Sequence, residues 1–351
     1  MEPAEPSPTP PPHQRRPRYR GRNPRAFHEK YKEHDPARFP GTVAKVVARG
    51  KTPAGTHRPI MCAEVLEALD PRPGQYAVDC TLGYGGHAEE LLRALAPGGH
   101  LLALDADPLE GNRTVARLRG AGFGADVFTW ERRNFAGLAA LVAGRRPEGA
   151  DLILADLGVS SMQLDRPERG FSVKLDGPLD MRMNPTRGLP AAEWLARVEA
   201  GPLARALWEN ADEPRAERLA ARLAGRAFDT TRALAEAVSA AVPPPDGDAT
   251  VRRVFQAVRM EVNEEMGALE ALLRALPGCL APGGRVALLT FHSGEDRRVK
   301  HAFRDGERAG VYAEVSDVVQ ASPAERRENP RSTAAKLRWA RRADPASDVS
   351  I

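Results

Sequence analysis

The sequence predicts an α/β fold with a parallel, doubly wound sheet that is interrupted by a helical insertion. Short apolar runs alternate with segments of helical periodicity up to residue 156, and the alternation resumes after residue 249. Residues 158–248 between them show helical periodicity and no strand pattern. We therefore expect two core parts, 53–157 and 249–341, around an inserted helical subdomain at 158–248.

The first core part contains four apolar runs of strand length. The strands are expected at 75–80, 100–105, 125–130 and 150–156, and the helices at 59–69, 86–95, 107–120 and 135–142. The third helix has the clearest start, because the acid Asp107 precedes Pro108, a typical N-cap followed by proline in the first turn. Strands and helices that alternate at this length indicate parallel strands.

The insertion and the second core part are predicted in the same way. Four helices are expected near 190–199, 201–210, 213–227 and 230–242, then a proline-rich linker, a long helix at 250–276, a strand at 285–291, a helix at 294–304 and a closing hairpin from 311–319 and 335–340.

Composition restricts the class of protein. The 351 residues include 42% hydrophobic ones and carry a net charge of +4, a mild indication of a polyanionic partner. No apolar run is long enough to cross a bilayer and no secretory signal is present, so a cytoplasmic location is expected. Cys62, Cys80 and Cys279 lack metal-ligand spacing, which predicts reduced thiols and no metal site.

The two ends of the chain differ from the rest. Residues 1–52 combine a proline run at 8–12 with six arginines between positions 15 and 25, too few apolar groups to fold alone. This tail either adds phosphate contacts to a nucleic-acid-binding protein or is a disordered, solubilising extension. Residues 342–351 are expected to be flexible.

A glycine-rich turn follows the first predicted strand, in Asp79-Cys-Thr-Leu-Gly83-Tyr-Gly85-Gly86-His87. Such glycines let the backbone approach a ligand and aim the amides of the following helix at it. Asp105 ends the second strand 105 − 86 = 19 residues after Gly86, the spacing of an acid that binds a ribose diol. These features predict a nucleotide-like cofactor, and an ordinary strand–helix turn is the alternative.

Polar residues end four of the predicted strands. They are Asp79, Asp105, Asp156 and the run Phe291-His292-Ser293. Ligands of open parallel sheets bind beyond the carboxyl ends of the strands. We therefore expect these residues to share one crevice, in which the acids suit a cationic ligand.

Several longer blocks resemble the RsmH (MraW) family, S-adenosylmethionine-dependent methyltransferases of bacterial small-subunit ribosomal RNA. The blocks are Asp156-Leu-Gly-Val-Ser-Ser-Met-Gln-Leu-Asp165, Arg169-Gly-Phe-Ser172, Asp176-Gly-Pro-Leu-Asp-Met-Arg-Met183, His57-Arg-Pro-Ile-Met61, Gly85-Gly-His87, Phe255-Gln-Ala-Val-Arg259 with Val262-Asn263, Phe291-His-Ser-Gly-Glu-Asp-Arg297 and Asn329-Pro-Arg331. The likeness covers residues 57–341 and implies a Rossmann-like class I methyltransferase sheet, with the insertion recognising the substrate.

The resemblance also implies site residues. S-adenosylmethionine would be bound by Gly85, Gly86, His87, Asp105 at the ribose, Phe135 beside the adenine, Asp156 and Gln163. To these the glycine-rich turn and the strand end before it add Gly83 and Asp79 as cofactor-binding candidates. The implied activity is methylation of N4 of one cytidine in the decoding region. Asp156 is the first candidate to orient or deprotonate the amine, and Ser160, Ser161, His292 and Ser293 are second candidates.

The substrate side is less defined. Pro-Pro-aromatic, frequent in amino-methyltransferases, is absent after Asp156, so Phe171 or Phe291 is expected to stack on the base unless Phe171 anchors the core. Basic residues that would contact the small-subunit rRNA, naked or in the assembled subunit, are Arg182, Arg187, Arg326, Arg327, Arg331, Lys336 and Arg338. A nicotinamide-dependent dehydrogenase and a non-enzymatic nucleic-acid binder are the alternatives. The oligomeric state is open, with a homodimer as one candidate.

Overall fold

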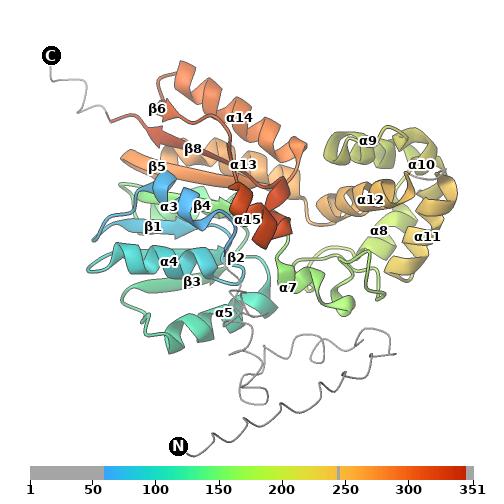
Figure 1. Cartoon of the computed structure of the whole chain (residues 1–351), viewed down its shortest axis with the longest axis horizontal. Helices are drawn as coiled ribbons and strands as arrows, with labels where there is room; N and C mark the ends of the chain where they lie inside the picture. Colours follow the sequence, from blue (N-terminus) through green and yellow to red (C-terminus); the bar gives the residue numbers. More distant parts are fainter. Residues whose placement is uncertain (1–58, 243–245, 345–351) are drawn as a thin grey trace, which may run out of the picture. The chain divides into compact units, whose positions relative to one another are not determined.

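The structure is a computed structural model that describes residues 59–242 and 246–344 (Figure 1). The predicted tail at 1–52 and the last residues of the predicted flexible C-terminus lie outside the described residues. Within the described part, no helix has the length and apolar character needed to span a bilayer.

Eight strands form one sheet, whose parallel part is the doubly wound sheet that the alternation of strands and helices predicted. Their order is β3-β2-β1-β4-β5-β8-β6, with β7 pairing β8, and the first five of these run parallel. Strand β8 is antiparallel to both β5 and β6 and provides the predicted closing hairpin. The strands are β1 (Tyr76–Asp79), β2 (His100–Asp105), β3 (Phe128–Arg132), β4 (Ala150–Asp156), β5 (Leu280–Thr290), β6 (Tyr312–Val315), β7 (Val319–Gln320) and β8 (Lys336–Arg342).

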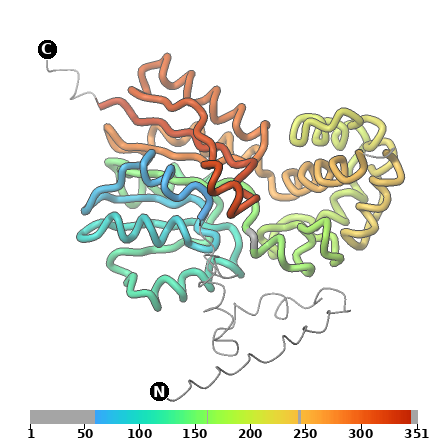
Figure 2. Tube along the Cα trace, in the orientation of Figure 1, coloured from blue at the N-terminus to red at the C-terminus, as the bar shows by residue number. Residues whose placement is uncertain are grey.

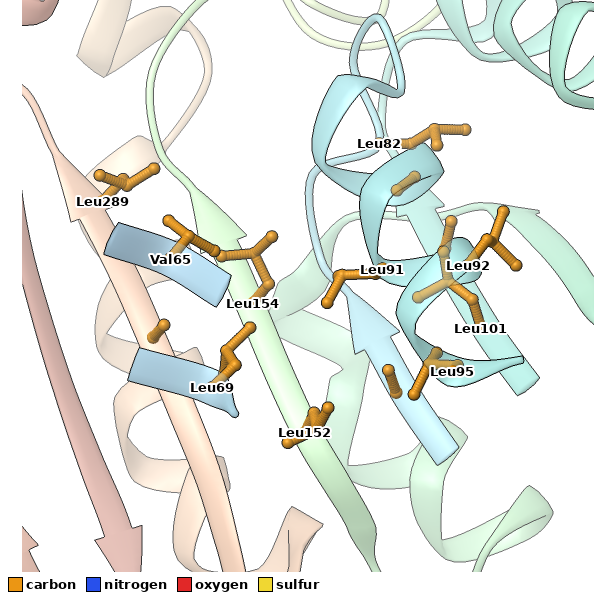
Figure 3. Close-up of a cluster of buried hydrophobic side chains, with 14 of the residues drawn as sticks. Val65, Leu69, Leu82, Leu91, Leu92, Leu95, Leu101, Leu152, Leu154 and Leu289 are labelled. Carbon is orange, nitrogen blue, oxygen red and sulfur yellow. The ribbon is translucent and has the colours of Figure 1, made fainter. Parts of the chain in front are cut away.

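Helices cover both faces of the sheet because neighbouring strand residues point to opposite faces. One layer holds α3 (Cys62–Leu69), α4 (Gly86–Leu95) and α5 (Pro108–Gly120), and the other holds α6 (Leu138–Arg145), α13 (Glu265–Cys279) and α14 (Ser293–Arg308). On β4, Leu152 and Leu154 contact the first layer, and Ile153 contacts the second. Figure 3 shows leucines and a valine of α3 and α4 packed over the strands of the first face.

A separate hydrophobic core lies within the insertion. It is formed by α8 (Ala191–Arg197), α9 (Ala200–Ala211), α10 (Ala216–Leu223), α11 (Thr231–Ala241) and α12 (Gly247–Val262), together with the loop residues Phe171, Leu179 and Met181. Helix α12 belongs to this core by packing, although the sequence placed most of it in the second core part. Figure 2 shows the chain returning from this helical group to the sheet, where β5 lies beside β4.

The predicted single helix at 250–276 is wrong. The helix is interrupted at Asn263, and Glu264 adopts a left-handed conformation with φ of 51° before α13 begins. The break has a packing cause, because α12 is buried in the core of the insertion and α13 in the second face of the sheet. One straight helix cannot serve both cores.

Candidate active site

The polar residues at the predicted strand ends do meet at one edge of the sheet. Strands β2, β1 and β4 are direct neighbours, so Asp105, Asp79 and Asp156 end side by side. His292 follows β5, the next strand along. The strand order reverses between β1 and β4, and such a switch point is where open α/β sheets bind their ligands.

The glycine-rich turn between β1 and α4 has a fixed, left-handed geometry. Gly85 is the N-cap of α4 with φ of 74°, and a Cβ there would lie only 2.5 Å from Cγ2 of Thr114. The Thr114 hydroxyl donates to the carbonyl of Gly83 at 2.6 Å, which ties the turn to α5. Only glycine satisfies both the backbone angle and the space at position 85.

Asp105 joins this turn to the segment after β2. Its Oδ2 accepts a hydrogen bond from the amide of Gly83 at 2.7 Å, and its Oδ1 accepts one from the amide of Asp107 at 2.7 Å. Burial raises the pKa of Asp105 to about 6, although the two amides act in the opposite direction. Since a carboxylate has about four acceptor positions, lone pairs remain for a ribose diol.

Asp79 is buried at the centre of the site. It is 1% exposed, and its Oδ1 accepts a hydrogen bond from the amide of Thr81 at 2.9 Å. Burial raises its pKa to about 6, more than the Thr81 amide and the charge of His87 lower it. The Thr81 hydroxyl accepts from the amide of Asp156 at 2.7 Å and so links the ends of β1 and β4. Thr81 was not identified from the sequence.

His87 and Asp156 form an ion pair across the turn. Nε2 of His87 lies 3.6 Å from Oδ2 of Asp156. Burial lowers the pKa of His87, but the interactions with Asp156, the Cys62 thiol and Asp79 outweigh it and raise the pKa to about 10. Oδ1 of Asp156 is buried and has no hydrogen-bond partner among the residues described. This oxygen is an acceptor left open at the switch point.

Gln163 is held by a buried polar network. Its Nε2 donates to Oδ2 of Asp107 at 2.9 Å, and its Oε1 accepts from the amide of Ser160 at 2.9 Å. Asp107 also caps α5, as predicted, and lies 2.8 Å from Nη1 of Arg169. The sequence identified Asp107 only as a helix cap and Arg169 only as a residue of a resemblance block. It did not predict that Asp107 binds Gln163 or that Arg169 pairs with Asp107.

The second candidates have structural partners. Nδ1 of His292 accepts from the amide of Glu295 at the start of α14, and its Nε2 lies 3.1 Å from Oε1 of Glu295. Ser293 donates to a carboxylate oxygen of Asp212. The hydroxyl of Ser160 accepts weakly from the Gln163 amide at 3.3 Å, and Ser161 begins the short helix α7 (Ser161–Leu164).

The aromatic candidates lie in different environments. Phe135 follows β3 and is half-buried against the second core face, at the edge where an adenine is expected. Phe171 is buried in the core of the insertion, in keeping with the anchoring alternative. Phe291 follows β5 and is half-buried. A Cβ added at Gly158, two residues after β4, would lie 3.7 Å from the ring of Phe291.

These residues fit S-adenosylmethionine. The glycine cradle admits a close ligand, Asp105 offers acceptors to a diol, and buried acids suit the sulfonium and ammonium charges. The sheet order, the glycine turn after β1 and the acid after β2 define a Rossmann-like fold with a nucleotide cofactor site. The buried acids beside that turn favour an S-adenosylmethionine-dependent methyltransferase.

Comparison with known proteins assigns the family. The family described as "MraW methylase family" matches residues 54–343, and the chain belongs to this family. It is 47% identical over 345 residues to "Ribosomal RNA small subunit methyltransferase H 1" of Lachnoclostridium phytofermentans, covering 94% of this chain and 93% of that protein. It is 42% identical to "Ribosomal RNA small subunit methyltransferase H" of Rubrobacter xylanophilus, covering 85% and 99%. The dehydrogenase alternative is therefore dropped.

Likeness to solved structures is much weaker. A SAM-dependent O-methyltransferase from Thermotoga maritima superposes with a TM-score of 0.38 and 9% identity, covering 80% of this chain and 64% of that one.

Proposed function

We propose that this protein methylates N4 of a specific cytidine in the decoding region of small-subunit rRNA. Support for the substrate comes from the relatives, which are named as small-subunit rRNA methyltransferases over nearly the full chain. Support for an amino group as the acceptor of the methyl group comes from Oδ1 of Asp156, which lies at the switch point without a hydrogen-bond partner among the described residues.

Methyl transfer to an exocyclic amine requires a hydrogen-bond acceptor beside the amine. The lone pair of an exocyclic amine is delocalised into the ring, so the amine is a poor nucleophile. A carboxylate oxygen that accepts its N–H localises the lone pair on nitrogen and takes the proton once the nitrogen becomes positively charged. When bound, S-adenosylmethionine supplies an electrophilic methyl group on a good leaving group.

His87 prepares Asp156 for this task. A positively charged imidazolium 3.6 Å from Oδ2 holds that oxygen and leaves Oδ1 free for the substrate. Both oxygens of a carboxylate accept hydrogen bonds, so Oδ1 can bind the amine while Oδ2 faces His87. The target base must leave its stack to reach this buried acceptor.

Transfer of labelled methyl groups tests the proposal directly. The protein is incubated with labelled S-adenosylmethionine and small ribosomal subunits that lack the modification, and the RNA is digested to nucleosides. Label in N4-methylcytidine is expected. Label in another nucleoside would contradict the assignment of the base, and cofactor binding without any transfer would favour the non-enzymatic nucleic-acid binder. A cytoplasmic location and a homodimer stay predictions.

A further inference from the structure

A pocket of about 400 Å³ lies between the core and the insertion. The core contributes Ala106, directly after Asp105, and Arg132 and Arg133 at the end of β3. The insertion contributes Arg187 from the loop before α8, and Glu264 comes from the α12–α13 break. The pocket therefore opens beside the ribose end of the expected cofactor site.

The charge of the pocket is positive. Three arginines and one glutamate line it, and Arg133 also approaches Glu131 outside the pocket at 3.5 Å. Within the described part of the chain, the side chains of Arg132 and Arg187 form no hydrogen bond or ion pair. Guanidinium groups without a partner in a concave site favour an anionic ligand.

Most of the other basic residues that the sequence suggested for RNA are already paired. Arg182 binds Asp180, Arg331 lies near Asp165, and Arg326 donates to a backbone carbonyl. Lys336 and Arg338 both pair with Asp296. Of that set, Arg187 is the one that lines this pocket with its guanidinium unpaired.

The cofactor does not account for these arginines. S-adenosylmethionine carries a net positive charge, and its adenine end, which the resemblance puts beside Phe135, is neutral. Placing cations around that end would oppose binding rather than help it. The required ligand is an anion that reaches the pocket while the cofactor site is filled.

The wall formed by the insertion is held in place. Oδ1 of Asn263 accepts from the amide of Met183 at 2.7 Å, and its Nδ2 donates to the carbonyl of Met181 at 2.8 Å. Glu264 beside it keeps a left-handed backbone, a cost that proteins retain where local geometry matters. The loop that carries Arg187 is thus fixed to the helix break before any ligand binds.

We propose that this pocket binds a backbone phosphate of the RNA substrate, next to the flipped target nucleotide, through Arg132 and Arg187. The proposal rests on the proposed function only in that the substrate is RNA, and it does not depend on which base is methylated. It makes the joint between core and insertion a substrate-binding surface that works together with the cofactor site.

Single substitutions with a matched control test the site. Arg132→Ala and Arg187→Ala remove one charge each inside the pocket, whereas Arg119→Ala removes one at the exposed end of α5, away from the site edge of the sheet. The KM for small subunits is measured over a series of KCl concentrations, and the Kd for S-adenosylmethionine is measured separately.

Each pocket variant should raise the KM for subunits about tenfold at low salt, the size of a lost charged hydrogen bond. The slope of log KM against log salt should fall by about one, as expected for one lost phosphate contact. The Kd for the cofactor should not rise, which also shows that the variant is folded. Arg132→Lys and Arg187→Lys should restore most of the slope, and Arg119→Ala should behave as the wild type.

Two results would overturn the proposal. A weakened cofactor Kd with an unchanged salt slope would assign the pocket to the adenine end of the cofactor. Unchanged KM and slope in both variants would show that no phosphate binds there. If the wild type transfers no methyl group, the same slopes are measured by equilibrium binding of labelled small-subunit RNA, so failure of the proposed function remains distinguishable.

Discussion

Nη1 of Arg169 lies 2.8 Å from Oδ2 of Asp107, and both side chains are almost fully buried. Nη2 of the same guanidinium donates to the carbonyls of Arg182 and Met183 in the loop of the insertion. Asp107 also holds Gln163 at 2.9 Å. One buried arginine therefore connects the loop of the insertion to a residue expected at the cofactor.

Arg169→Ala should lower both stability and cofactor affinity. Removing Arg169 leaves the charge of Asp107 buried without its ionic partner, a loss of about 3–5 kcal/mol in the free energy of unfolding. The Kd for S-adenosylmethionine should also rise, since Asp107, the partner of Gln163, loses the arginine that holds it in place. Urea denaturation and calorimetric titration measure the two effects.

The matched control is Arg197→Ala, which breaks an exposed pair with Glu193 one helical turn away. It should change stability by less than about 0.5 kcal/mol. A similar small effect for Arg169→Ala would show that the buried connection contributes nothing.

Gly85→Ala should abolish tight cofactor binding. The residue has φ of 74°, and the added Cβ would lie 2.5 Å from Cγ2 of Thr114, so the turn has to move away from α5. Gly74→Ala is the control, because its φ is 84° while no atom lies within 4 Å of the added Cβ. Both variants share the backbone strain of about 1–2 kcal/mol. Equal cofactor Kd values for the two would contradict the importance of the close approach.

Cofactor binding should depend on pH around 6. Burial raises the pKa of both Asp79 and Asp105 to about 6, and a cationic ligand binds the ionised forms. Affinity should be complete above this pH and fall as the pH drops to 5. Calorimetric titration of wild type and Asp79→Asn from pH 5 to 8 checks this, and the variant should be weaker with a shallower pH dependence.

Stability without cofactor should change in the opposite direction. The folded state binds more protons than the unfolded state between about pH 4 and 6, because the folded pKa values lie above the ordinary value of 3.8. These two groups therefore destabilise the free protein as the pH rises through that window.

A cofactor affinity that does not change between pH 5 and 8 would contradict the assigned roles of both acids.

The sequence predicted those features that depend on neighbouring residues. Apolar runs ending in Asp79, Asp105 and Asp156 located the strands and, through the rule for parallel sheets, the site edge. The N-cap at Asp107 was equally local. Each of these features follows from residues that are close by in the sequence.

Features set by distant partners could not be predicted in this way. The ion pair of Asp107 with Arg169 joins segments that no periodicity relates. The helix is interrupted at Asn263 because the side chain of this residue binds the backbone of Met181 and Met183 in the insertion. In addition, α12 and α13 are buried in two different cores. The residues around Asn263 have the periodicity of one uninterrupted helix.

The measurement that tests the central claim most directly is the single-turnover rate of methyl transfer by Asp156→Asn at saturating S-adenosylmethionine and small subunits. The substitution keeps the size of the side chain and removes the charge that accepts the amine proton. The rate should fall by about 10²–10⁴-fold, the usual contribution of a positioned acid or base, while the cofactor Kd changes only slightly. An undiminished rate with weakened cofactor binding would contradict the account and leave Asp156 as a cofactor ligand only.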